Sequence, residues 1–247
     1  MNNYTAKPPK IIELETSSLC NLKCVMCPQS LTGKYGVQRP NHLPELIVDK
    51  VIPYITDETE CISLHGIGEP FLSKSFWKIL PLLPAGCHSQ CNTNMTVLTD
   101  KMLDSIVNSN FNLLNVSIDA SEAELYEAIR GFDFKKVSNN IRRLVDRRNE
   151  LGNTSLKVYC NMTLMKCNIE SVIDFMEFFI GDIGVDAVQL WPLNNWGKQA
   201  NDRYNQGEFN YEYQGLWNHK QLYKKCISEA KQYAKQKNWT LIIDEKL

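Results

Sequence analysis

Short apolar runs and amphipathic stretches alternate along nearly the whole of this 247-residue chain. Apolar runs bounded by turn residues predict strands, and apolar positions at helical spacing predict helices. The predicted strands are 11–16, 61–65, 89–93, 113–118, 156–164, 185–191 and 239–243. The predicted helices are 46–55, 76–83, 102–107, 122–129, 137–151, 169–180 and 222–237. This α/β alternation predicts a parallel sheet covered by helices, closed or half-closed as a barrel.

Several predicted strands carry one polar face, whereas the packed interior of an eight-stranded barrel is mostly bulky and apolar. The polar positions are Glu13, Glu15, Ser63, His65, Asn115, Ser117, Asp119, Tyr159, Asn161, Thr163 and Gln189. The opposite faces are apolar enough to lie under helices. We therefore expect an interior wide enough for a large polar ligand. The alternative is a solvated sheet face, as in many antiparallel sheets.

Charge and composition exclude several functions. With 27 Lys and Arg against 28 Asp and Glu, the net charge is −1, which argues against a nucleic-acid partner bound through a broad basic face. No apolar run approaches the roughly 18 residues of a membrane span, so no membrane partner is expected. Residues 1–12 lack the apolar stretch of a secretory signal. We expect one cytoplasmic domain over residues 1–247.

Nine cysteines stand out in this composition, and in a cytosolic chain they indicate metal or redox chemistry rather than disulfides. Cys20, Cys24 and Cys27 form a C-x3-C-x2-C motif in a loop, 17–42, after the first predicted strand. A structural zinc site needs four ligands. Three thiolates on a 4Fe-4S cluster leave one iron open to another ligand. The alternatives are another metal site or three unligated cysteines. The other six cysteines are expected to pack in the core.

Further motifs accompany the cysteines in order along the chain. They are Gly66-Ile67-Gly68-Glu69-Pro70 after the second strand, Thr93-Asn94-Met95 at the end of the third, Ser117-Ile118-Asp119-Ala120 at the end of the fourth, and then Arg130-Gly131. With these motifs and the cysteine triplet, the chain resembles the radical S-adenosylmethionine (radical SAM) enzymes over essentially its whole length. The family has Gly-Gly-Glu-Pro and Thr-Asn-Gly at the first two places, so Ile67 and Met95 depart from its pattern. The resemblance implies a partial (β/α)6 TIM-like barrel with parallel strands and outer helices, forming one radical SAM core domain.

The resemblance also implies roles for individual residues. Cys20, Cys24 and Cys27 would hold the 4Fe-4S cluster. The residues implied to contact S-adenosylmethionine are Met26 at the adenine, Gly66, Gly68 and Glu69 at the methionine amino group, Ser117 and Arg130 at the ribose and carboxylate, and Asn161. Structural alternatives are an Arg130–Asp133 ion pair and a purely structural barrel role for Asn161. No residue is assigned to act on the substrate.

The implied chemistry begins when the reduced cluster passes one electron to the sulfonium of S-adenosylmethionine. The resulting 5′-deoxyadenosyl radical abstracts a hydrogen atom from a peptide or sugar-type substrate. A low-potential electron donor, such as flavodoxin or ferredoxin, is implied as a partner, and the enzyme is expected to be oxygen-sensitive. We expect the aromatic-rich loop 192–215, which contains Trp196 and Tyr204, to line or cover the substrate mouth, because barrel sites form at the carboxyl ends of strands.

The core is most similar to the SPASM or Twitch branch, whose members carry a C-terminal cysteine-rich extension and modify peptides, proteins and aminosugars. After Cys167 this chain has only Cys226, so we expect a one-cluster enzyme without that extension. Two alternatives stay open. The chain is the N-terminal catalytic domain of a longer peptide- or aminosugar-modifying maturase, or it is an iron–sulfur and S-adenosylmethionine-binding protein that has lost turnover.

Overall fold

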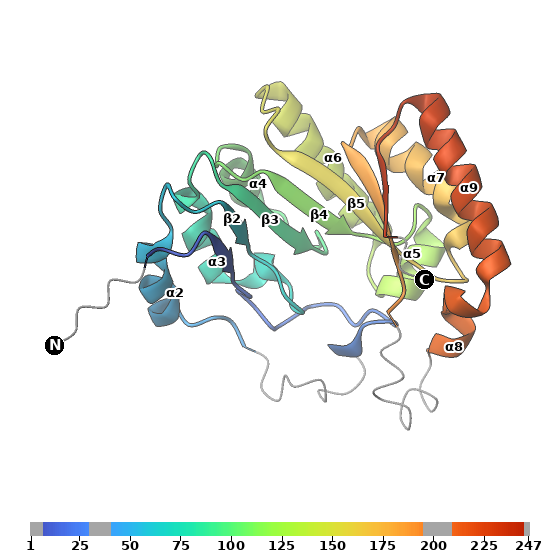
Figure 1. Ribbon diagram of the computed structural model, residues 1–247, viewed down its shortest axis with the longest axis horizontal. Coiled ribbons are helices and arrows are strands. Elements are labelled where there is room, and N and C mark those ends of the chain that lie inside the picture. Colours follow the sequence, from blue (N-terminus) through green and yellow to red (C-terminus); the bar gives the residue numbers. More distant parts are fainter. Residues whose placement is uncertain (1–6, 30–40, 195–208, 245–247) are drawn as a thin grey trace.

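The computed structural model describes residues 7–29, 41–194 and 209–244. Seven strands form one sheet in the order β1 to β7, and every neighbouring pair is parallel. The strands are β1 Ile11–Glu13, β2 Cys61–Ser63, β3 His88–Thr93, β4 Leu113–Ser117, β5 Lys157–Leu164, β6 Ala187–Pro192 and β7 Leu241–Ile243. The sheet curves as a partial TIM-type barrel with helices around its outer side (Figure 1). The predicted fold class is confirmed.

The helices connect successive strands, as the alternating pattern predicts. The α-helices are α2 Glu45–Val51, α3 Lys74–Ile79, α4 Asp100–Val107, α5 Ala123–Arg130, α6 Phe134–Glu150, α7 Val172–Met176, α8 Tyr211–Gln214 and α9 Lys220–Lys237. The predicted helix 76–83 ends early, because Pro81 lies in a 3-10 turn over Leu80–Leu82. The predicted helix 169–180 is α7 with a preceding 3-10 turn and a following π-helix, Glu177–Ile183.

The sheet separates an apolar outer layer from a more polar inner one, and β5 shows this most clearly. Val158, Cys160 and Met162 are fully buried, whereas the alternate residues Asn161 and Thr163 are only partly buried. Successive side chains of a strand point to opposite faces, so the apolar set packs beneath the helices. The polar set faces the concave side, where Gln90 of β3 donates to Ser63 of β2. The structure therefore supports the predicted polar interior.

The cysteines outside the triplet do not all pack in the core. Cys87, Cys91, Cys160 and Cys226 are buried, and Cys61 is half-buried. Cys167 is exposed, so the packing prediction is wrong there: Cys167 lies in the turn after β5, and its backbone N–H donates to the side chain of Gln214. Among the described residues, no helix is long and apolar enough to cross a membrane.

Candidate active site

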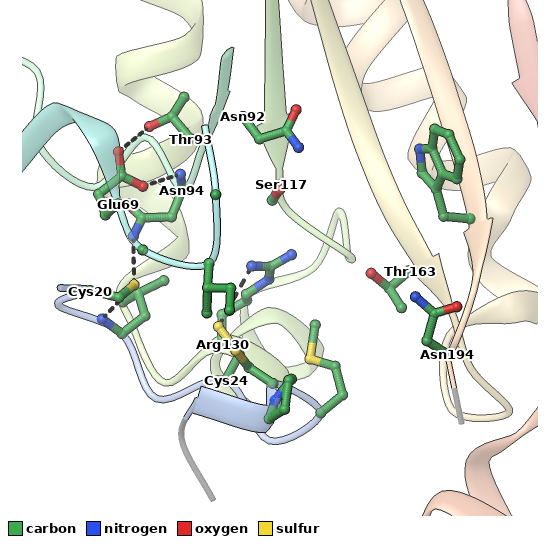
Figure 2. Close-up of a pocket in the computed structure, with 18 of the residues that line it drawn as sticks. Cys20, Cys24, Glu69, Asn92, Thr93, Asn94, Ser117, Arg130, Thr163 and Asn194 are labelled. Atoms are coloured by element: carbon green, nitrogen blue, oxygen red, sulfur yellow. Dashed lines mark hydrogen bonds between the residues drawn. The ribbon is translucent and has the colours of Figure 1, made fainter. Parts of the chain in front are cut away.

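A cavity of about 460 Å³ opens at the carboxyl ends of the strands, beside the loop that carries the cysteine triplet. Figure 2 shows its lining, which comes from both ends of the chain. The predicted residues that line it are Cys20, Cys24, Met26, Cys27, Gly66, Gly68, Glu69, Ser117 and Arg130. Asn161 pairs with Ser117 across β4 and β5 but is not among the described lining residues. The fold thus gathers nine of the ten predicted residues around one space.

All three cysteines of the triplet line this cavity, and two of their thiols receive hydrogen bonds from nearby N–H groups. Cys20 Sγ accepts from the backbone N of Leu22 at 3.5 Å, and Cys24 Sγ accepts from Arg130 Nη1 at 3.6 Å. Burial raises the pKa of both thiols, and the charge of Arg130 partly offsets the rise at Cys24. In the described parts of the chain, no three His, Cys, Asp or Glu side chains converge as a single-ion site requires. The three cysteines line one cavity, as the ligands of a single iron–sulfur cluster would.

Glu69 is a buried carboxylate whose oxygens are held by three donors. Glu69 is only 2% exposed. Its Oε1 accepts hydrogen bonds from the backbone N of Phe71 at 3.0 Å and from Thr93 Oγ1 at 2.7 Å. The backbone N of Asn94 donates to its other oxygen at 2.7 Å. Burial raises the pKa of Glu69 above its ordinary value despite these donors. The carboxylate has a fixed position at the cavity wall and suits a cationic amino group.

Gly68, directly before Glu69, lets two backbone segments meet. A Cβ on Gly68 would lie 2.2 Å from the carbonyl oxygen of Ser17, so only glycine fits there. The next backbone N–H, that of Glu69, donates to Leu19 O at 2.7 Å. The glycine loop is thereby fixed against the cysteine loop. Ile67 departs from the family pattern without cost, because its side chain is 46% exposed.

Arg130, at the end of α5, pairs with Asp119 rather than with the sequence neighbour Asp133. Arg130 Nε lies 2.6 Å from Asp119 Oδ2, and both side chains are almost fully buried. Burial disfavours the Arg130 charge, but Asp119 and Cys24 outweigh burial and raise its pKa. Asp133 instead begins α6, where its side chain accepts from the backbone N of Lys136. The predicted alternative ion pair is therefore wrong.

Two non-glycine residues at this end of the sheet have a left-handed backbone conformation. Met95 has φ of +54°, and Asp119 has φ of +66°. Such values are uncommon outside glycine and cluster at functional sites. Asp119 Oδ1 accepts from the backbone N of Thr163 at 2.6 Å, which holds the carboxylate near Arg130. Met95, the second residue that departs from the family pattern, is fully buried in the turn after β3.

Part of the cysteine loop packs in a small apolar cluster of its own. It contains Leu22, Cys24, Met26, Ile129, Met165, Leu193, Phe209 and Tyr211. Tyr211 Oη donates to Met26 O at 2.5 Å, so the segment from residue 209 onward is joined to the residue before the third cysteine. Of the predicted loop 192–215, residues 192–194 line the cavity. Trp196 and Tyr204 lie outside the described residues, so their covering role stays a prediction.

Comparison with known proteins agrees with this geometry. The family model of the radical SAM superfamily matches residues 14–179, which include the cysteine triplet, the glycine motif and Arg130. The chain belongs to the radical SAM superfamily. Its members carry an iron–sulfur cluster and bind S-adenosylmethionine, and the radical SAM chain described here is an enzyme of that class.

Relatives of this radical SAM chain have several activities. It is 26% identical over 78% of its length to a tungsten-containing aldehyde ferredoxin oxidoreductase cofactor-modifying protein of Pyrococcus furiosus. It is 28% identical over 78% of its length to a probable GTP 3′,8-cyclase of Methanocaldococcus jannaschii. The chain covers 54% and 63% of these two proteins, less than two thirds of either.

Solved structures show the same fold. SuiB of Streptococcus suis bound to S-adenosylmethionine has a TM-score of 0.69 at 17% identity, covering 96% of this chain and 50% of SuiB. SuiB bound to its precursor peptide SuiA has a TM-score of 0.68 at 16% identity, covering 96% of this chain and 48% of SuiB. At such low identity, these likenesses concern the architecture.

Sequence reasoning missed several residues that the structure places in or beside this cavity. Thr93, Asn94 and Asp119 were in the quoted motifs, but no role was assigned to them. Their position at strand ends was the signal that could have found them. Tyr211 belongs to the predicted loop 192–215, but its contact with Met26 had no local signal, because the two residues are 185 positions apart.

Proposed function

We propose that this radical SAM enzyme binds a 4Fe-4S cluster through Cys20, Cys24 and Cys27 and holds S-adenosylmethionine in the cavity beside it. The observation that carries the proposal is the convergence of the three thiols, Glu69 and Arg130 on one cavity. Cys20, Cys24 and Cys27 would hold the cluster, and Glu69 and Arg130 the cosubstrate; with one electron from a low-potential donor, the bound pair would supply the chemistry for abstracting a hydrogen atom from the substrate. The single domain proposed for this activity spans residues 1–247.

Each side of the cosubstrate has a proposed partner in this chain. Glu69 binds the methionine amino group, because its buried carboxylate is fixed by three donors and suits a cation. Arg130 and Ser117 bind the carboxylate and ribose, and the Asp119 pair orients the Arg130 guanidinium. Met26 packs at the adenine, with its backbone held by Tyr211. Gly66 and Gly68 join Glu69 at the methionine amino group, where bare glycine backbone allows close approach. Asn161 contacts the cosubstrate from the inner face of β5.

The described cavity wall favours a neutral or cationic substrate of peptide or sugar type. Among the described lining residues Arg130 is the one cationic side chain, and it is already paired with Asp119. The side formed by β5, β6 and the residues after β6 carries Thr163, the ring of Trp191 and Asn194, and β3 adds Asn92; these supply neutral hydrogen-bonding groups and an aromatic face. A triphosphate typically requires several cationic groups. SuiB, a structural neighbour solved with a precursor peptide, is compatible with a peptide in such a barrel.

The test of the proposed function is anaerobic reconstitution with iron and sulfide, followed by a cleavage assay. With a low-potential reductant, the reconstituted protein should convert S-adenosylmethionine to 5′-deoxyadenosine and methionine. Replacing Cys20, Cys24 and Cys27 together by Ala should abolish both cluster uptake and cleavage. Cleavage that persists in this triple variant would sink the assignment.

The matched control replaces three thiols that lie outside the cavity. Cys61, Cys167 and Cys226 are half-buried, exposed and buried, respectively, and none is among the cavity-lining residues. The variant with all three changed to Ala should keep the iron and sulfide content of the unmodified protein. Equal loss in the two triple variants would show that the total number of thiols, rather than the motif, governs cluster uptake.

A further inference from the structure

A closed ring of three side chains ties the cysteine loop to the end of β3. Asn94 Nδ2 donates to Asn21 Oδ1 at 3.1 Å, and Asn21 Nδ2 donates to Thr96 Oγ1 at 2.8 Å. Thr96 Oγ1 completes the ring by donating to Asn94 Oδ1 at 2.7 Å. Asn94 is 6% exposed and Thr96 is fully buried. Because Asn21 directly follows Cys20, the ring fixes that thiol relative to the sheet.

The orientation of the Asn94 amide follows from its neighbours. The backbone N–H of Thr96 can only donate, and it lies 3.0 Å from Asn94 Oδ1. The amide nitrogen must therefore face the cysteine loop, where Nδ2 lies 3.7 Å from Cys20 Sγ (Figure 2). An N–H group aimed at a thiolate makes a charge-assisted hydrogen bond. The ring thus holds a donor in place at one of the proposed cluster ligands.

The backbone of the same residue contacts the cosubstrate side of the cavity. The N–H of Asn94 donates to Glu69 Oε2 at 2.7 Å. Asn94 therefore touches both the carboxylate proposed for the methionine amino group and the thiol proposed for the cluster. Figure 2 shows Asn94 between these two groups.

We propose that Asn94 is a positioning residue whose amide donates to the Cys20 thiolate and raises the reduction potential of the cluster. The inference rests on the proposed function, because Cys20 must ligate the cluster. Reduction adds negative charge, and a hydrogen bond to a ligand sulfur stabilises the more negative state. Cys20 Sγ also accepts from the backbone of Leu22, a bond that side-chain substitution leaves intact. Asn94 is therefore the donor that mutation can remove selectively.

The test is a redox titration of the reconstituted protein without S-adenosylmethionine, followed by electron paramagnetic resonance. Asn94→Ala should lower the midpoint potential of the cluster. At a fixed solution potential the ratio of reduced to oxidised cluster should fall by up to about tenfold, which for a one-electron couple is about 59 mV. An Asn94→Ala protein that loads the cluster and titrates at the unmodified potential overturns the proposal.

Asn92→Ala is the matched control. Asn92 has the same side chain, lies on the same strand and lines the same cavity, and among the described residues no hydrogen bond joins its side chain to the cysteine triplet. Its backbone O accepts from the thiol of Cys91, a bond that side-chain substitution leaves intact. Its replacement should leave the potential unchanged. An equal shift in both variants would overturn the proposal, because the shift would then reflect cavity polarity rather than the bond to Cys20.

Thr96→Val provides a second test should Asn94→Ala fail to take up the cluster. The substitution keeps the shape of Thr96 and removes the hydroxyl that holds Asn94 Oδ1. It should shift the potential in the same direction by a smaller amount, and an unchanged potential would count against Asn94. Unmodified protein that takes up no iron and sulfide would contradict the proposed function itself, which separates the two failures.

Discussion

The two walls of the cavity differ in how completely their polar groups are held. The near wall consists of Glu69, Thr93, Asn94 and Arg130, which are between 2% and 8% exposed and bonded to one another or to Asp119. The far wall consists of Thr163, Trp191, Pro192 and Asn194, which are partly or largely exposed, with Trp191 at 44%. The near wall is thus built before any ligand binds, as a fixed cosubstrate requires. The far wall offers its groups to a substrate.

Of the substitutions in the two walls, Arg130→Ala should lower the free energy of unfolding the most. The substitution leaves the Asp119 carboxylate buried and unpaired, which typically costs about 3–5 kcal/mol. The free energy of unfolding, measured in urea, should fall by that amount. The control is Arg147→Ala, which removes a surface arginine paired with Asp104 and Glu150 and should cost less than about 1 kcal/mol. Similar losses of stability in both variants would show that the buried Arg130–Asp119 pair is no more important for folding than a surface ion pair.

Glu69→Gln should have the next largest effect. The new amide presents N–H groups to donors that already point at the carboxylate, so we expect a loss of about 1–3 kcal/mol. The affinity for S-adenosylmethionine, measured by calorimetry on reconstituted protein, should fall as well. Unchanged stability and affinity would remove Glu69 from the proposed site.

The same residue predicts a pH dependence in the chain without cosubstrate. Burial raises the pKa of Glu69, so the folded chain retains a proton that the unfolded chain releases. Below the unfolded pKa this contribution to stability is fully present, and it is lost as the pH rises through the raised, folded pKa. Urea denaturation at successive pH values should show this decline, and Glu69→Gln should flatten it. The control is Glu15→Gln, a change at an exposed carboxylate beside the glycine loop. In this variant the stability should still decline with rising pH as in the unmodified protein.

Tyr211→Phe tests whether the segment that contains Tyr211 stabilises the cysteine loop at Met26. It removes only the hydroxyl that donates to Met26 O, so we expect about 0.5–1.5 kcal/mol of lost stability. Because Met26 is proposed to contact adenine, the affinity for S-adenosylmethionine should fall several-fold. Tyr213→Phe, a change on the same helix at a residue that is 55% exposed, is the control. Equal effects from the two would refute the role of the Met26 contact.

Asn194→Ala should have the smallest effect. Asn194 is exposed at the far wall, and surface substitutions usually change stability by less than about 0.5 kcal/mol. Urea denaturation should therefore hardly distinguish it from the unmodified protein. A loss comparable to that of Glu69→Gln would mean that the far wall is as firmly built as the near one.

The pattern of apolar residues predicts the seven strands and the polar inner face, because burial on alternate sides of a strand leaves a direct mark on sequence. The cysteine triplet and the glycine motif are likewise local, since each is a short run after a strand. Side-chain contacts between residues far apart in the sequence leave no such local pattern. Asp119 rather than Asp133 meets Arg130 because the turn after β4 adopts a left-handed conformation that places its carboxylate there. The bond from Tyr211 to Met26 depends on the path of the chain through the whole barrel.

The most direct test of the central claim is the electron paramagnetic resonance spectrum of the reduced, reconstituted protein before and after addition of S-adenosylmethionine. A cluster held by Cys20, Cys24 and Cys27 in the same cavity as Glu69 and Arg130 should give a 4Fe-4S signal that changes when the cosubstrate binds. The change should be absent in Glu69→Gln at the same cosubstrate concentration. A spectrum without such a signal, or one that S-adenosylmethionine leaves unaltered in the unmodified protein, would contradict the account.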